Sequence, residues 1–278
     1  MVCPLLFCCR SSKEEPEVPE ENPFELPCGC GDEWPPEEPV CQWVLAWDFP
    51  VKPGMAEWAQ FKTYQERVDA CQIPEVVLTQ LSTEDLTEIC LQYPFLFQVL
   101  SAYKTLDIGL DEMIEQFNGI RALYEREDAY KALLKRYRCR MLSMSYLYEP
   151  VTDAEKGRFI NSISEMEVLL SRFQSPDATN DMYMEILQHL FCGHEKRIPY
   201  YLEIVDYDMF LYADPVNFFA RAVILLKIDE QYLAQIPITI RGGNPAIPQE
   251  RNEVFRRGLL DEPTWHIVNE ISCNLINQ

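Results

Sequence analysis

Glycine is scarce in this sequence, and no hydrophobic run is long enough to cross a membrane. The 278-residue chain contains 10 glycines and 20 prolines. So few glycines disfavour a turn-rich β-sandwich, whereas prolines commonly mark the joints between helices. The longest apolar stretch, NFFARAVILLKI, is interrupted by Arg221 and is shorter than the roughly 18 residues of a spanning helix. Hydrophobic residues still make up 47% of the chain, enough for a substantial core.

Positive charge is also in short supply. The 24 Lys and Arg residues face 45 Asp and Glu residues, which gives a formal net charge of −21. Such a chain repels phosphate backbones, so we expect no nucleic-acid partner. One basic run stands out, from Leu133 to Met141, with Lys135, Arg136, Arg138 and Arg140. It could dock an acidic partner, but we interpret it as a solvated helix face paired with neighbouring acids.

Recognisable catalytic and cofactor motifs are missing. The sequence has only three histidines and contains no G-x-S-x-G, P-loop, G-x-G-x-x-G or H-E-x-x-H pattern. No two pairs of cysteines have the C-x2-C spacing of a structural zinc site. We therefore expect no cofactor, and the balance favours a protein that is not an enzyme.

The most metal-like group is His189, Cys192 and His194. On a helix, His189 and Cys192 would share one face, and His194 follows Gly193, where we expect that helix to end. These soft ligands could hold zinc or copper. No fourth ligand is marked by spacing, so we interpret the group as a buried cysteine and two histidines at a helix end.

A second candidate site is the acidic and aromatic stretch around Asp206, Tyr207 and Asp208. Paired carboxylates here could perform acid–base chemistry if an apolar pocket raised the pKa of one of them. Aromatic rings beside acids also suit a contact surface for a carbohydrate or a peptide. The plainest interpretation is a half-buried segment whose acids are solvated.

Eleven cysteines are spread along the chain. Four of them fall within helical patterns, where we expect them to be small buried hydrophobic residues: Cys71, Cys90, Cys139 and Cys273. Cys28, Cys30 and Cys41 lie in a segment rich in Pro and Glu. A disulfide between Cys41 and one of the other two is one interpretation, and three free thiols is the other.

The first forty residues look like a signal and a tether. Residues 1–9 have the apolar character of a signal-peptide remnant, and Cys9 is the candidate for lipidation. Residues 10–40 carry ten acidic and two basic side chains with many prolines, which predicts a disordered linker. A lipid anchor would place the protein on the bacterial cell envelope, at the outer membrane. The alternative location is the cytoplasm.

Beyond about residue 55 the pattern is helical, with repeated start signals. Ser82 with Asp85 and Thr152 with Glu155 have the spacing of capping pairs. Short helices with short joints predict an all-α fold, an irregular array of antiparallel helix pairs behind the N-terminal tether. Residues 41–278 are expected to form a single helical domain, with a possible subdivision near residue 150.

Residues 48–128 contain the series PVKPG..EW, ERV.ACQIP, ST..L...C..YP and FNG...L..R.D. This series resembles a group of exported proteins of Bacteroidetes bacteria. The resemblance implies an exported location and assigns no catalytic residue.

The leading functional hypothesis is a non-catalytic binding module of an envelope lipoprotein, with a protein or a glycan as its partner. One alternative is a secreted carboxylate-dependent hydrolase with its site near residues 206–214. The other is a cytoplasmic helical adaptor, whose cysteines would stay reduced.

Overall fold

The computed structural model describes residues 30, 41, 43–98, 106–174, 180–203, 213–229, 231–232 and 262–277. This part of the chain contains ten α-helices, two short 3-10 helices and no strand, so the predicted all-α class is confirmed. The proposed lipidation residue Cys9 lies outside the described residues, as does the segment with Asp206, Tyr207 and Asp208.

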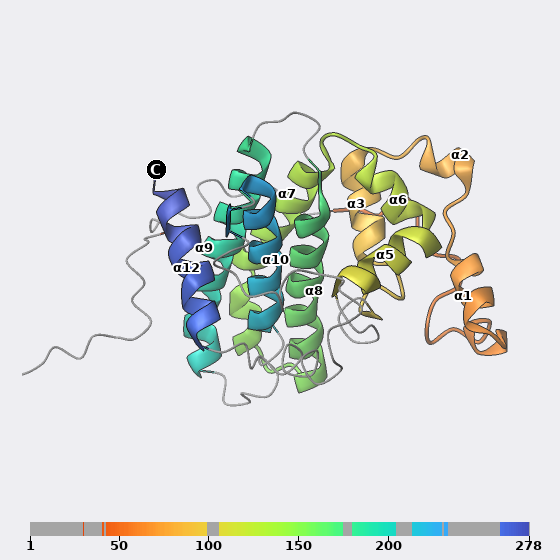
Figure 1. The fold of residues 1–278 in the computed structure, drawn as a ribbon. Coiled ribbons are helices and arrows are strands. Elements are labelled where there is room, and N and C mark those ends of the chain that lie inside the picture. Colours follow the sequence, from red (N-terminus) through yellow and green to blue (C-terminus); the bar gives the residue numbers. More distant parts are fainter. Residues whose placement is uncertain are drawn as a thin grey trace, which may run out of the picture.

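The first group of helices lies at one end of the molecule (Figure 1). It consists of η1 (Trp58–Gln60), α1 (Tyr64–Ala70), α2 (Glu75–Leu78), α3 (Thr83–Leu91), α5 (Leu106–Gln116) and α6 (Asn118–Tyr124). The Ser82 side chain accepts a hydrogen bond from the Asp85 backbone N–H at 3.1 Å, which confirms the predicted start of α3. The Asn118 side chain joins the start of α6 to the Ile73 backbone by two hydrogen bonds.

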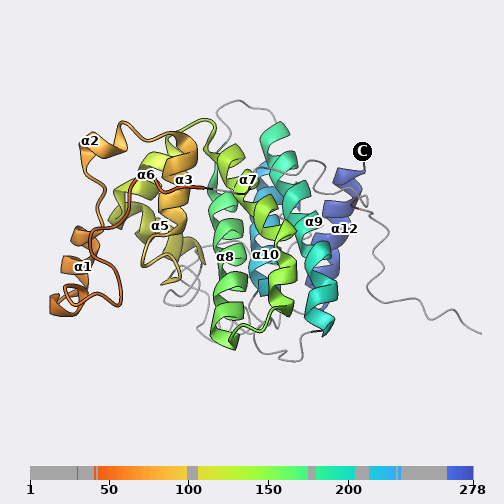
Figure 2. The ribbon, with the colours of Figure 1, turned by 180° about the vertical axis from the view of Figure 1, so that it is seen from behind.

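The second group stands side by side with roughly aligned axes (Figures 1 and 2). It consists of α7 (Ala129–Leu142), η2 (Met144–Tyr148), α8 (Asp153–Arg172), α9 (Asp181–Glu203), α10 (Ala213–Ile228) and α12 (Glu262–Ile276). Thr152 and Glu155 form a reciprocal capping box at the start of α8, as their spacing predicts. α10 packs mainly against α8 and α9, and no described helix is both long and apolar enough to span a membrane.

One continuous hydrophobic core runs through both groups, from Phe49 to Ile271. In the first group, Tyr93 and Phe117 stack with ring centroids 4.1 Å apart. The second group contributes the apolar faces of the long helices. α3 packs against both α6 and α7 and so connects the two groups through buried side chains.

Gly193 does not end a helix, contrary to the sequence-based expectation. α9 continues through this position to Glu203. A Cβ atom at Gly193 would lie 2.1 Å from the Tyr137 hydroxyl oxygen. The glycine therefore allows α9 to approach a tyrosine of α7 closely, a requirement that comes from another helix and not from the local sequence.

The cysteines pair differently from the predictions. Disulfides join Cys30 to Cys192 and Cys41 to Cys139, so the predicted bridge between Cys41 and Cys28 or Cys30 is wrong. The expectation that Cys139 is a buried free thiol is also wrong, and Cys273 is disulfide-bonded too. Cys71 and Cys90 are buried and free, as predicted.

Candidate functional site

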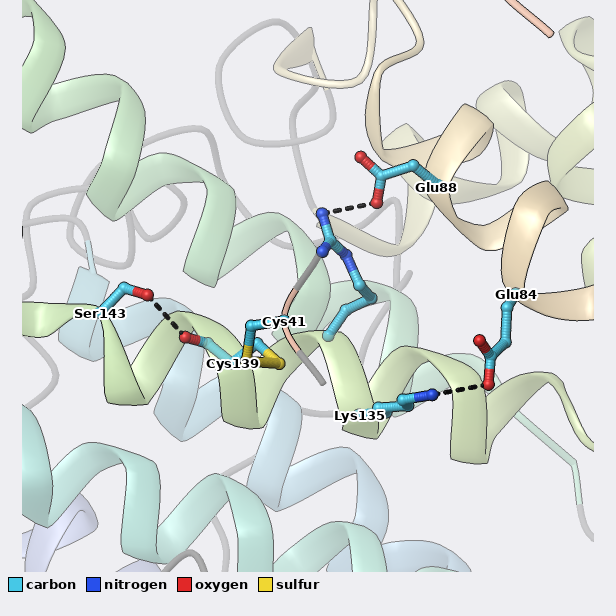
Figure 3. Close-up of a disulfide and its surroundings, with 7 residues drawn as sticks. Cys41, Glu84, Glu88, Lys135, Cys139 and Ser143 are labelled. Atoms are coloured by element: carbon cyan, nitrogen blue, oxygen red, sulfur yellow. Dashed lines mark hydrogen bonds and ion pairs between the residues drawn. A yellow bond between two sulfur atoms is a disulfide. The ribbon is translucent and has the colours of Figure 1, made fainter. Parts of the chain in front are cut away.

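A cavity of about 210 Å³ lies where α3, α7 and α8 meet the segment that contains Cys41 and Trp43. We call it the Cys41 pocket. Its lining combines cationic, acidic, hydroxyl and apolar side chains: Cys41, Trp43, Leu91, Arg136, Cys139, Arg140, Ser143, Ser162, Glu165 and Met166. Figure 3 shows the Cys41–Cys139 bridge on α7, with Ser143 at the C-terminal end of that helix.

Helical spacing explains why these residues share the pocket. On α7, the lining positions 136, 139 and 140 are three and four residues apart, which places them on one face, and Ser143 follows at the C-cap of that helix. On α8, positions 162, 165 and 166 have the same spacing. The disulfide fastens Cys41 to α7, and this attachment holds Trp43 close to the same face.

Arg136 contacts both an acidic side chain and an aromatic ring. One of its terminal nitrogens lies 2.5 Å from a Glu88 carboxylate oxygen, and both side chains are largely buried. Its guanidinium carbon lies 3.7 Å from the centre of the Trp43 ring, a close cation–π contact. Burial lowers the pKa of Arg136, and the charge of Glu88 opposes that change.

Lys135, one residue earlier, points to a different neighbour. It pairs with Glu84 at 2.8 Å on the exposed side of α7 (Figure 3). Two residues of the basic run, Lys135 and Arg136, therefore pair with acids, as we interpreted the run. The Lys135 pair is solvated, whereas the Arg136 pair is largely buried.

Arg140, one turn further along α7, has no such direct acidic partner among the residues that the structure describes. Its guanidinium lies 5.0 Å from the centre of the Phe159 ring. No described residue gives this guanidinium a hydrogen bond, or an ion pair within 4.0 Å. Burial lowers the pKa of Arg140, and the more distant charges of Glu88 and Glu165 oppose that change.

Glu165 lines the pocket with a carboxyl group that burial keeps in its neutral form. Burial raises the pKa of its carboxyl from 4.5 to about 8, against the opposing charge of Arg140. Near neutral pH this carboxyl is therefore mostly protonated. The Arg136, Arg140 and Glu88 charges then leave the pocket with one excess positive charge, in a chain whose formal net charge is −21.

The hydroxyl groups of the two pocket serines donate hydrogen bonds to nearby backbone carbonyls. The Ser143 hydroxyl donates to the Cys139 carbonyl at 2.9 Å, and the Ser162 hydroxyl donates to the Phe159 carbonyl at 2.6 Å. No histidine is among the described residues that line the cavity. The described lining therefore offers charged and hydrogen-bonding groups, and the proton of each serine hydroxyl is donated to the backbone.

The weak metal candidates do not form a ligand set. Cys192 is bonded to Cys30, so it has no thiolate to offer. The His189 ring nitrogen Nδ1 lies 2.8 Å from the Glu185 carbonyl, and the buried His194 ring meets the Phe218 ring edge-on. Within the described ranges, no group of three or more His, Cys, Asp or Glu side chains could hold a metal ion.

A second polar cluster lies deep between α7, α8, α9 and α10. Glu167 and Arg197 are fully buried and 3.0 Å apart. Tyr137 and Asn217 each donate to a Glu167 carboxylate oxygen at 2.8 Å. Burial raises the pKa of Glu167, and Arg197 opposes that change. This cluster joins side chains of four helices through buried contacts, so we assign it a structural role.

Sequence reasoning found only part of the pocket. The basic run drew attention to Arg136 and Arg140, but nothing in the sequence marked Glu165 or Trp43 as their neighbours. Comparison of the chain with family models, curated proteins and solved structures finds no match.

Proposed function

We propose that this protein is a non-catalytic binding module of the bacterial envelope, carried on the acidic tether and anchored through Cys9. The Cys41–Cys139 disulfide is the main support for this proposal. Disulfides persist in oxidising compartments and are rare in the cytosol of ordinary bacteria. The bridge therefore favours an exported protein over the cytoplasmic adaptor.

The chemistry of the Cys41 pocket favours binding over catalysis. Arg140 lacks a hydrogen-bonded partner among the described residues and can meet a ligand directly. The hydroxyl groups of the pocket serines donate to backbone carbonyls and not to a side-chain base. The hydrolase alternative, near residues 206–214, receives no support from the described residues.

Two measurements on protein isolated from cells test this proposal. Mass spectrometry of unreduced peptides should recover a peptide pair linked through Cys41 and Cys139. Cys9→Ala should move the protein from the membrane fraction to the soluble fraction, whereas Cys71→Ala, a substitution of a buried free cysteine, should not. Reduced cysteines at 41 and 139, or unchanged fractionation of Cys9→Ala, would contradict the envelope assignment.

A further inference from the structure

We propose that the Cys41 pocket binds a small organic monocarboxylate, with its carboxylate on Arg140 and its non-polar part against Trp43 and Met166. This inference deepens the proposed binding function and rests on it. It starts from geometry: a cavity of about 210 Å³ that contains a half-buried guanidinium without a hydrogen-bonded partner among the described residues. A guanidinium binds a planar carboxylate through two parallel hydrogen bonds.

Arg136 does not compete for this role. Glu88 and the Trp43 ring already occupy it, at 2.5 Å and 3.7 Å. Arg140 is supported from one side by the Phe159 ring, which leaves its nitrogen atoms available at the cavity. The two arginines are four residues apart on α7, so Arg136 still adds positive charge on the same helix face.

The size and the walls of the pocket set the rest of the ligand. Engineered apolar cavities of about 150 Å³ accept benzene, so this cavity accommodates a carboxylate attached to a ring or a short aliphatic chain. Leu91, Met166 and the Trp43 ring supply apolar wall. Thioether and aromatic surfaces adapt well to small non-polar groups.

The charge of the pocket selects a monoanion. The single negative charge of a monocarboxylate balances the one excess positive charge of the pocket. A phosphate dianion would instead leave one buried negative charge unbalanced. A zwitterionic amino acid would bring an ammonium group near Arg136 and Arg140 while Glu165 is mostly protonated. A protonated Glu165 can instead donate a hydrogen bond to a bound carboxylate.

Glu165 makes the expected binding depend on pH. The charged groups around it are Arg140 and Arg136 on α7 and Glu88 on α3. As the pH rises through about 8, Glu165 ionises and removes the excess positive charge. Carboxylate affinity should therefore be nearly constant between about pH 6 and pH 7 and fall several-fold by about pH 9.

The test is calorimetric titration of the full, oxidised protein with benzoate at about pH 7. Wild type should bind with a dissociation constant below about 1 mM, and at least tenfold more tightly than it binds inorganic phosphate or alanine. Arg140→Gln should weaken benzoate binding at least tenfold. The matched control is Lys135→Gln, which removes the same charge from the same helix outside the pocket and should change affinity less than twofold.

Glu165→Gln separates this mechanism from a general effect of charge. Because glutamine is neutral at every pH, the benzoate affinity of this variant should lose the decrease that wild type shows at about pH 9. Thermal unfolding of each variant checks that the fold is retained, and Arg140→Lys replaces Arg140→Gln if the glutamine variant fails to fold. Lysine keeps the charge but not the paired hydrogen bonds, so it should still weaken benzoate binding several-fold.

Three results would overturn the inference. They are no benzoate binding by wild type, equal weakening by Lys135→Gln and Arg140→Gln, and tighter binding of phosphate or alanine than of benzoate. Each would leave the fractionation and disulfide results unchanged, so failure of this inference is distinguishable from failure of the envelope assignment.

Discussion

Replacing Gly193 by alanine should destabilise the protein, although alanine is the better helix former. The added Cβ atom would lie 2.1 Å from the Tyr137 hydroxyl oxygen and 2.7 Å from two carbon atoms of its ring. Tyr137 is fully buried and donates to Glu167, so its ring has no open space to enter. Overpacking of this kind costs about 1–3 kcal/mol. Displacing the hydrogen bond to the carboxylate costs about 1.5–3 kcal/mol more.

Helix propensity acts in the opposite direction, because alanine in place of glycine stabilises a helix by about 1 kcal/mol. We therefore expect Gly193→Ala to lower the free energy of unfolding by about 1.5–5 kcal/mol, measured by urea denaturation. Gly157→Ala is the control, because Gly157 is a partly exposed residue of α8. This substitution should stabilise the protein by up to about 1 kcal/mol. If Gly193→Ala also stabilises the protein, then the close approach of α7 and α9 is wrong.

A Tyr137→Phe background separates the cost that comes from the tyrosine hydroxyl group from the cost that comes from the ring. Without the hydroxyl oxygen, the 2.1 Å contact disappears and the 2.7 Å ring contacts remain. Gly193→Ala should therefore cost at least about 1 kcal/mol less in this background than in wild type. Equal costs in both backgrounds would mean that the hydroxyl group is not what excludes a side chain at position 193.

Three further predictions concern the cysteines and Glu165. Replacing both Cys41 and Cys139 by serine should lower the free energy of unfolding by about 2–5 kcal/mol in urea, since their bridge closes a long loop; a loss below about 1 kcal/mol would contradict this. Glu165→Gln should stabilise the protein, increasingly from about pH 4.5 to pH 8, because the unfolded carboxyl ionises over that range while the folded one stays protonated. Thermal unfolding at several pH values measures this, and a constant difference would refute it. Burial raises the pKa of Cys71 to about 11 and that of Cys90 further, so a thiol reagent should label both in urea and neither in the native protein.

Local signals explain what the sequence predicted well. The start of α8 depends on Thr152 and Glu155, which lie three residues apart and cap each other. Ser82 marks the start of α3 in the same way. Such contacts form within one turn of the chain, so spacing alone reveals them. The helical class follows from these signals and from the periodic apolar positions.

Contacts between distant segments explain what the sequence did not predict. Gly193 looked like a helix end, but its role is decided by Tyr137 on another helix. Cys139 has the pattern of a core residue, and only the approach of Cys41, 98 positions away, makes it a disulfide partner. The same reasoning applies to the pocket, because Glu165 lies in an ordinary amphipathic helix until α7 places Arg140 beside it.

The disulfide connects the proposed location with the proposed site. Trp43 lies two residues after Cys41, and its contact with Arg136 depends on a segment that packs against α7 where the bridge is formed. A reduced chain lacks this constraint, so holding the Trp43 wall in place costs more conformational entropy. Under the proposed export, oxidation both stabilises the fold and completes the pocket. The pocket would then be ready to bind only after the chain has reached the compartment where the ligand is met.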